Sequence, residues 1–231
     1  MRVYVVAAVG MAMLALAGSA SAGIVGLTNT NQIDLSGVTL GSDGVPVGGY
    51  ALNLVGENDK TVCGVTFKPL GGPYTVPGAS ANGAAYHWSD SGFGISPVAG
   101  TDGDTMMSIL NSFFYDNGAN VTMAVTPGKT YTLQLFGSAA AWPDTSFDVD
   151  ISATPGLDGD ELFVAGGKNY LYTTTFTANA STVGVTLYYG STGANNYPVM
   201  AAALLTEAVP EPATMSLMAL GSLAALSRRR K

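Results

Sequence analysis

Residues 121–135 have the sequence VTMAVTPGKTYTLQL, and this stretch decides the fold. Apolar residues alternate with threonine, alanine and glutamine on both sides of Pro127-Gly128, which is the two-residue period of a strand with one buried face. Pro-Gly marks a turn, because proline fixes one backbone angle and glycine tolerates conformations that other residues avoid. The pattern therefore predicts two strands joined as a hairpin with one apolar face.

The same alternation recurs along the chain at short intervals. Phe147, Val149 and Ile151 alternate with Asp148 and Asp150, so the two aspartates are expected to face solvent. Further strands are expected at Ala51–Val55, Val62–Phe67, Tyr170–Thr177, Thr182–Tyr189 and Met200–Thr206, and one helix at Asp104–Asn111 with Asp104 as its N-cap.

The fold class follows from these elements. About nine short strands joined by turns rich in Gly, Pro, Asn and Ser define an all-β domain, and two packed sheets bury the alternating apolar faces. We expect an antiparallel jelly-roll-like β-sandwich at residues 23–208, flanked by an N-terminal signal helix and a short C-terminal transmembrane helix. An up-and-down barrel is the alternative.

The first residues have the pattern of a signal peptide, expected at residues 1–22. Arg2 supplies a positive charge, Val3 to Ala17 is apolar, and Ala20-Ser21-Ala22 is a small-x-small cleavage site. Signal peptidase is therefore expected to cleave before Gly23, and the chain is expected to be exported.

The last residues, 209–231, have three parts. These are the motif Val209-Pro210-Glu211-Pro212, an apolar segment at 213–227 and a basic tail of Arg228, Arg229, Arg230 and Lys231. The apolar segment has 15 residues, fewer than the roughly 20 that cross a bilayer in a helix. The basic tail is expected to stop transfer and remain cytoplasmic. The alternative is an ordinary C-terminal membrane anchor.

These three parts together resemble the PEP-CTERM sorting signal of Gram-negative bacteria. The resemblance implies that an exosortase recognises the tail and cleaves it. It also implies a precursor anchored in the inner membrane, and a product that moves to the cell surface or the extracellular matrix. A short, marginal anchor suits a precursor that is later released.

Charge and cysteine content limit the function of the expected mature segment. Residues 23–208 contain four lysines and 15 of the 16 acidic residues, a net charge of about −11. A surface so poor in lysine and arginine cannot neutralise the phosphate groups of a nucleic acid, which excludes nucleic acid as a partner. Cys63 is the single cysteine, so no intrachain disulfide forms, and it is expected to be buried in the strand around Val62–Phe67.

No catalytic residue is predicted. His87 is the single histidine, and the chain lacks the common nucleophile and metalloprotease motifs. A secreted hydrolase remains one alternative, with candidate carboxylates at Asp90, Asp102, Asp104, Asp144, Asp158, Asp160 and Glu161. Thr101–Asp104 and residues 158–161 resemble fragments of calcium loops without their full spacing, so we expect solvated turns, no metal site and no cofactor, with structural calcium as the alternative.

Four aromatic or imidazole side chains remain as candidates for ligand contact. Tyr86, His87, Trp88 and Trp142 fall in stretches rich in Gly, Ala, Ser and Pro, which indicates loops. Exposed rings in loops stack on sugars, and they also plug the open ends of sandwiches. Trp88 and Trp142 are therefore the candidate sugar-contacting residues, and His87 is expected to be a solvent-facing loop residue.

The centre of the chain carries a second resemblance. The residues that carry it are Met107-x-x-Leu110-x-x-Phe113-Phe114-Tyr115, Val121-Thr122, Val125 to Phe136 and Phe147-Asp148-Val149. They are similar to galactose-binding-like and malectin-like β-sandwich domains, which implies a fold and a tendency to bind sugars. The sequence thus predicts an exported, non-enzymatic surface or matrix protein associated with exopolysaccharide, with a carbohydrate-binding module as the alternative.

Overall fold

The computed structural model describes residues 29–36, 38, 49–70, 74–87, 97–138, 145–152, 160–164, 168–189 and 198–208. Within these ranges the side chains of 86–87, 116–117, 145–148, 150 and 160–164 are left out of the description. All described residues belong to one compact unit, Ala22–Ala208. The expected signal helix and transmembrane helix lie outside the described residues, and within those residues no helix is long and apolar enough to cross a membrane.

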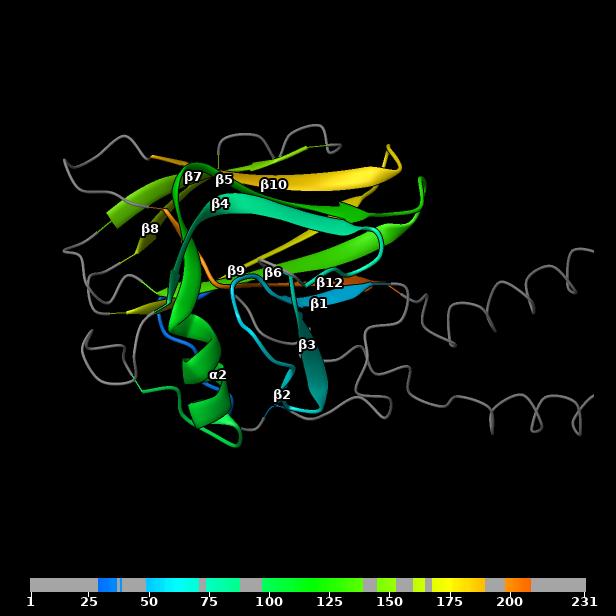
Figure 1. Ribbon diagram of the computed structural model, residues 1–231. Helices are drawn as coiled ribbons and strands as arrows, with labels where there is room; N and C mark the ends of the chain where they lie inside the picture. Colours follow the sequence, from blue (N-terminus) through cyan, green and yellow to red (C-terminus); the bar gives the residue numbers. More distant parts are fainter. Residues whose placement is uncertain are drawn as a thin grey trace, which may run out of the picture. The chain divides into compact units, whose positions relative to one another are not determined.

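The described part of the chain is built from short strands and one helix (Figure 1). The strands are β1 (Tyr50–Asn53), β2 (Lys60–Val62), β3 (Val65–Pro69), β4 (Ala79–His87), β5 (Ser112–Ala124), β6 (Thr130–Ser138), β7 (Thr145–Ile151), β8 (Asp160–Val164), β9 (Asn169–Thr177), β10 (Thr182–Tyr189), β11 (Val199–Met200) and β12 (Ala202–Glu207). The helix is α2 (Gly103–Leu110).

Two six-stranded sheets form a sandwich. Sheet 1 has the order β2-β3-β1-β12-β6-β9, and sheet 2 has the order β11-β5-β10-β7-β8 with β4 paired to β5. Figure 1 shows β4, β5 and β10 in the upper layer and β1, β6 and β12 in the lower one. The inner quartets β1-β12-β6-β9 and β5-β10-β7-β8 have the strand order of a jelly roll. The pairing is antiparallel except between β1 and β3, so the expected all-β sandwich is confirmed.

The predicted hairpin at residues 121–135 is wrong. β5 pairs with β4, β10 and β11, whereas β6 pairs with β9 and β12, so the two strands lie in different sheets. The Gly128 N–H donates to the carbonyl of Ala178 at 2.7 Å, and the Ala178 N–H donates to the carbonyl of Lys129 at 2.9 Å. The alternation identified the buried face of each strand, but the period of two carries no information about the hydrogen-bonded partner.

The main core lies between the sheets and contains the apolar residues of that stretch. Val121 and Met123 of β5 face Leu133 and Leu135 of β6, and all four are fully buried. Val149 and Ile151 of β7 join the same cluster, as the alternation predicted. Burial of one such side chain contributes about 1.5–3 kcal/mol, so this layer is the main stabilising element of the domain.

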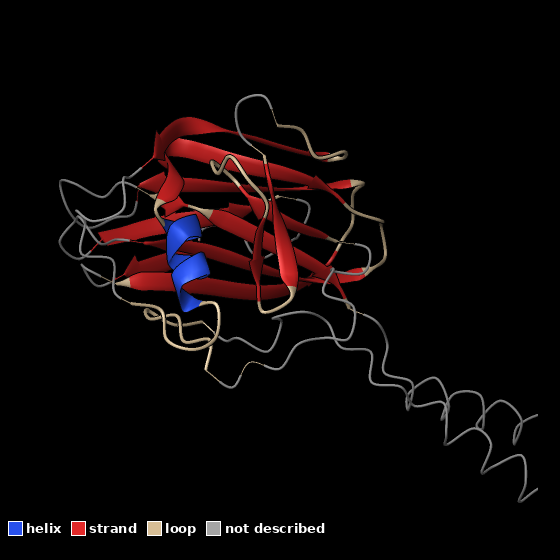
Figure 2. Ribbon diagram, turned by 60° about the horizontal axis from the view of Figure 1, so that its bottom comes forward, coloured by secondary structure: helices blue, strands red, loops and turns tan. Residues whose placement is uncertain are grey.

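The outer face of the central strands of sheet 1 is also covered. The helix α2 packs there (Figure 2), together with residues 33–35 and the β2–β3 pair from the edge of the same sheet, where Phe67 of β3 contacts Phe136 of β6. Met106 and Ile109 of α2 are fully buried there, in one cluster with Phe136 of β6 and Leu204 of β12. β12 is therefore buried on both faces. For this reason its first four residues, Ala202–Leu205, form a continuous apolar run and do not alternate.

A hairpin does form at residues 60–69, where one strand was expected. β2 and β3 pair through Val62 and Val65, and the two residues between them have positive φ, 47° at Cys63 and 76° at Gly64. Positive φ at both central positions is the geometry of a type I′ turn, which matches the twist of the strands it joins. Cys63 is buried as expected, but it lies in this turn and not in a strand.

A charge placed on the inner face of β6 should unfold the domain. Leu133 is fully buried between the sheets, so Leu133→Asp puts an unpaired carboxylate in the core. The cost is comparable to a total stability of about 5–15 kcal/mol. The fragment 23–208 carrying this change should lose its β-type far-ultraviolet spectrum and its cooperative denaturant transition.

The control for this experiment is Thr175→Asp, which places the same charge on the outer face of β9. Thr175 is exposed, so this variant should unfold with a midpoint close to that of the parent fragment. Equal loss in the two variants would mean that the buried face of these strands is assigned incorrectly.

Candidate functional site

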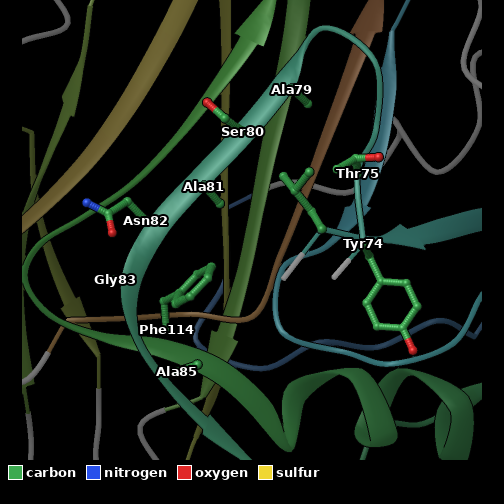
Figure 3. Close-up of a pocket in the computed structure, with 10 residues that line it drawn as sticks. Tyr74, Thr75, Ala79, Ser80, Ala81, Asn82, Gly83, Ala85 and Phe114 are labelled. Carbon is green, nitrogen blue, oxygen red and sulfur yellow. The ribbon is translucent and has the colours of Figure 1, made fainter. Parts of the chain in front are cut away.

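The candidate functional site is a groove of about 400 Å³ that runs along β4. Its lining residues are Leu70, Tyr74, Thr75, Ala79, Ser80, Ala81, Asn82, Gly83, Ala85 and Phe114. Figure 3 shows Tyr74 and Thr75 on one side of β4, with Ser80 and Asn82 pointing to the other side. Side chains from both faces of β4 line the groove, so the groove follows the free edge of this strand.

β4 lies at an edge of sheet 2. Among the described strands it pairs only with β5, through residues 79–87. An edge strand presents a row of backbone N–H and C=O groups that have no partner in the sheet. The sequence of β4, ASANGAAYH, contains no proline and no Asp, Glu, Lys or Arg, so it lacks the residues that commonly protect an edge.

A β-bulge shapes the middle of the groove. The register between β4 and β5 shifts between Asn82 and Ala84, around Gly83. A Cβ atom on Gly83 would lie 3.1 Å from the side chain of Phe114, so glycine lets the strand approach the ring closely. Phe114 is only 5% exposed and forms the floor beneath Gly83 (Figure 3).

Tyr74 supplies an exposed ring on the opposite side of the groove. Its side chain is 38% exposed, and it stands clear of β4 in Figure 3. In the described part of the chain, none of the lining residues carries a charge. The groove therefore combines an aromatic ring, small apolar side chains and polar groups, a composition that suits a neutral ligand with both C–H and O–H faces.

A second hollow, also of about 400 Å³, lies at one end of the sandwich and has a different character. It is lined by Gly49, Tyr50, Ala124, Val125, Thr126, Tyr131 and Glu207. Tyr131 is 1% exposed and its hydroxyl accepts a hydrogen bond from the Thr126 N–H at 2.9 Å. The Glu207 carboxylate pairs with Lys129 at 3.0 Å, and this contact raises the pKa of the lysine. The polar groups of this hollow thus support the fold.

The structure does not describe the two predicted sugar-contacting residues. Trp88 and Trp142 lie outside the described residues. Tyr86 and His87 were expected in a loop, and this prediction is wrong for the backbone, because both are the last residues of β4. Tyr74 was not predicted. The nearby Pro73 and Pro77 signal only a turn, and nothing in the sequence places Tyr74 beside β4.

The calcium-like segment Thr101–Asp104 has a structural role at its second residue. Asp102, and not Asp104 as predicted, is the N-cap of α2, with φ of 63°. Its side chain makes no cap hydrogen bond to the helix. One carboxylate oxygen accepts the backbone N–H of Cys63 at 2.8 Å, so Asp102 ties the turn between β2 and β3 to the start of α2.

The Cys63 thiol behaves as a structural group. Burial, and then the charge of Asp102, raises the pKa of the Cys63 thiol, which disfavours a reactive thiolate. Asp160 and Glu161 of the second calcium-like segment begin β8. Within the described part of the chain no three His, Cys, Asp or Glu side chains gather as metal ligands.

Comparison with solved structures defines the class of the domain. The ANX1 ectodomain from Arabidopsis thaliana matches with a TM-score of 0.53 and 14% identity, over 71% of this chain and 49% of that one. The ANXUR1 extracellular domain from the same plant matches with a TM-score of 0.53 and 13% identity, over 71% of this chain and 49% of that one. A calcium-binding mutant of Bacteroides uniformis beta-glucuronidase 2 matches with a TM-score of 0.52 and 12% identity, over 70% of this chain and 18% of that one.

At these identities the likeness shows the fold alone. The structural neighbours of the domain include malectin-like and galactose-binding-like β-sandwich folds, which confirms the resemblance seen in its central residues. The chain spans about half of the plant ectodomains and about a fifth of the glucuronidase. None of the curated proteins matches it.

A family model identifies the other end of the chain. Residues 208–231 match the PEP-CTERM protein-sorting motif, which confirms the resemblance of the tail. The match includes Val209 to Pro212 and Arg228 to Lys231. The chain therefore carries the sorting signal of an exported protein that an exosortase processes. The expected signal peptidase site at Ala20, Ala22 and Gly23 lies outside the described residues.

Removal of the Asp102 carboxylate should destabilise the domain measurably. Asp102→Ala leaves the N–H of buried Cys63 without its acceptor, which costs about 1–3 kcal/mol, and it places alanine at positive φ. Chemical denaturation of fragment 23–208 measures the change.

Asp104→Ala is the matched control, since Asp104 is exposed in the first turn of the same helix. It should cost less than about 1 kcal/mol. An Asp102→Ala variant no less stable than Asp104→Ala would contradict the role assigned to the Cys63 contact.

Proposed function

We propose that this chain is the precursor of a non-enzymatic protein of the cell surface or extracellular matrix, cleaved at its PEP motif by an exosortase and associated with exopolysaccharide. The match of residues 208–231 to the sorting motif is the observation that carries this proposal. A signal peptide at residues 1–22 provides the route across the inner membrane.

Each part of the tail has a physical role in this scheme. The two prolines, Pro210 and Pro212, favour an extended segment that a protease can enter. The apolar segment of 15 residues reaches about 22 Å as a helix and holds the precursor only marginally in a bilayer. The basic tail stays on the cytoplasmic side.

The end of the folded domain agrees with a cut in this tail. β12 ends at Glu207, and the N–H of Ala208 still donates to the carbonyl of Thr130 at 2.8 Å. The motif begins with the next residue, Val209. A cleavage at or after this position takes no described strand from either sheet, so the released product keeps its fold.

A carbohydrate-binding module is the second candidate function, and the groove along β4 favours it. Sugar recognition relies on an exposed ring together with hydroxyl, amide and backbone groups. Tyr74, Thr75 and Asn82 provide such groups without a charged residue. The described residues that line the groove include no carboxylate pair of the kind that glycoside hydrolysis requires.

The sorting motif should be required for release. Replacing Pro210 and Glu211 by alanine removes the residues that define the motif, so the precursor should accumulate in the membrane fraction while the parent protein is released. Mass spectrometry of the released protein should find no Arg228–Lys231 peptide.

Glu57→Ala is the control, because Glu57 is an exposed acid that is not part of the tail. Its release should equal that of the parent. An intact basic tail on the released parent protein would exclude the proposed cleavage.

The domain should cross the inner membrane before processing. Alkaline phosphatase, which folds only in an oxidising compartment, should be active when fused before Val209 in a chain that keeps residues 1–22. The same fusion without residues 1–22 should be inactive. An inactive fusion with the intact N-terminus would overturn the topology.

A further inference from the structure

We infer that the groove along β4 binds a neutral polysaccharide, with a sugar ring stacked on Tyr74 and its hydroxyl groups on the free edge of β4. This inference rests on the proposed association with exopolysaccharide and assigns that association to one site. The groove is about 400 Å³ in volume, at the lower end of the range for small-molecule sites, which suits one or two sugar rings of a longer chain.

Tyr74 provides the face for stacking. Its ring is 38% exposed, whereas the other aromatic residue of the groove, Phe114, is 5% exposed and belongs to the floor. The methyl groups of Ala79 and Ala81 lie on the Tyr74 side of β4 (Figure 3). A sugar ring presents C–H groups on its faces, so it gains contact with an aromatic ring and with methyl groups together.

The edge of β4 supplies hydrogen bonds that suit hydroxyl groups. Backbone N–H and C=O groups on a free edge both donate and accept, as do sugar hydroxyls. The side chains of Thr75, Ser80 and Asn82 are exposed and add further donors and acceptors. Ligand hydroxyls can therefore replace the water that these groups bind when the groove is empty.

The charge distribution selects a neutral ligand. None of the described residues that line the groove is charged, and residues 23–208 carry a net charge of about −11. Two of the four lysines in this segment are engaged elsewhere, Lys68 with Asp59 and Lys129 with Glu207. An anionic polysaccharide would meet repulsion and no cation in the groove.

The bulge at Gly83 disfavours the other ligand that an edge strand attracts, an extended peptide. Peptides that add a strand need a regular row of edge groups and side pockets for alternate residues. The register shift between Asn82 and Ala84 interrupts that row, and alanines and glycine line the groove where such pockets would lie. Sugar hydroxyls do not require a regular repeat.

The test measures how strongly the full chain is retained on polysaccharide gels. The chain is kept in a polyoxyethylene detergent that contains no sugar. The gels are a neutral glucan and a neutral galactan, with alginate as the anionic reference. The parent chain should be retarded by a neutral gel and not by alginate. Tyr74→Ala should weaken that retention about ten-fold, as loss of a central aromatic contact does, while Tyr74→Phe should retain it because the ring remains.

Tyr188→Ala is the matched control. Tyr188 is 40% exposed, close to the 38% of Tyr74, and it is not part of the groove, so its removal should leave retention unchanged. Equal losses in the two alanine variants, retention on alginate alone or no retention on any gel would overturn the inference. Binding of an extended alanine- and serine-rich peptide instead of a polysaccharide would overturn it in favour of strand addition.

Hydrogen exchange on the parent chain tests the site without any substitution. Oligosaccharide fragments of the retaining gel should slow amide exchange in residues 79–82 and leave residues 173–177 of β9 unchanged. Unchanged exchange at β4 with a bound oligosaccharide would place the sugar elsewhere. These measurements do not depend on cleavage of the tail, so failure of the groove and failure of exosortase processing are distinguishable.

Discussion

Burial of β12 on both faces is the constraint on which the rest of the structure depends. Residues 202–206 of this strand are all at most 2% exposed, so sheet 1 needs a cover on each side. Sheet 2 covers one face of β12, and α2, residues 33–35 and the β2–β3 pair at the edge of sheet 1 cover the other. The contact of Asp102 with Cys63 holds the second cover together, because it joins α2 to the β2–β3 turn. The domain is thus a sandwich with a third, partial layer.

Alternation in the sequence predicted the buried faces well and the strand partners poorly. Val121, Leu133, Val149 and Val185 are all buried in the main core, because a strand between core and solvent must alternate. The connection through Gly128, however, joins two different sheets. Alternation could not show this, because a hairpin and a crossing between sheets bury the same face of each strand. The turn at Cys63 was missed because cysteine rarely adopts positive φ, and here the Asp102 carboxylate holds its backbone.

The groove could not be predicted from the sequence for a related reason. β4 consists mainly of alanine, serine, asparagine and glycine, which have low strand propensity and no apolar period. Its strand conformation comes from pairing with β5, a tertiary effect. The position of Tyr74 beside β4 depends in turn on the tight turn in which the Ala79 N–H donates to the Val76 carbonyl at 3.0 Å. The sorting tail was predictable because its recognition depends on local sequence and not on folding.

The order of strands along the chain connects the fold to the sorting signal. β12 pairs with β1 at Leu205 and Tyr50 and with β6 at Leu205 and Leu133, so the last strand in sequence closes the centre of sheet 1. Because β12 bridges β1 and β6, sheet 1 is incomplete until Glu207 has joined it. The sorting motif matches from residue 208 onward, directly after this strand. The proposed cleavage of the tail would therefore remove none of the strands that the structure describes, because the last of them ends at Glu207.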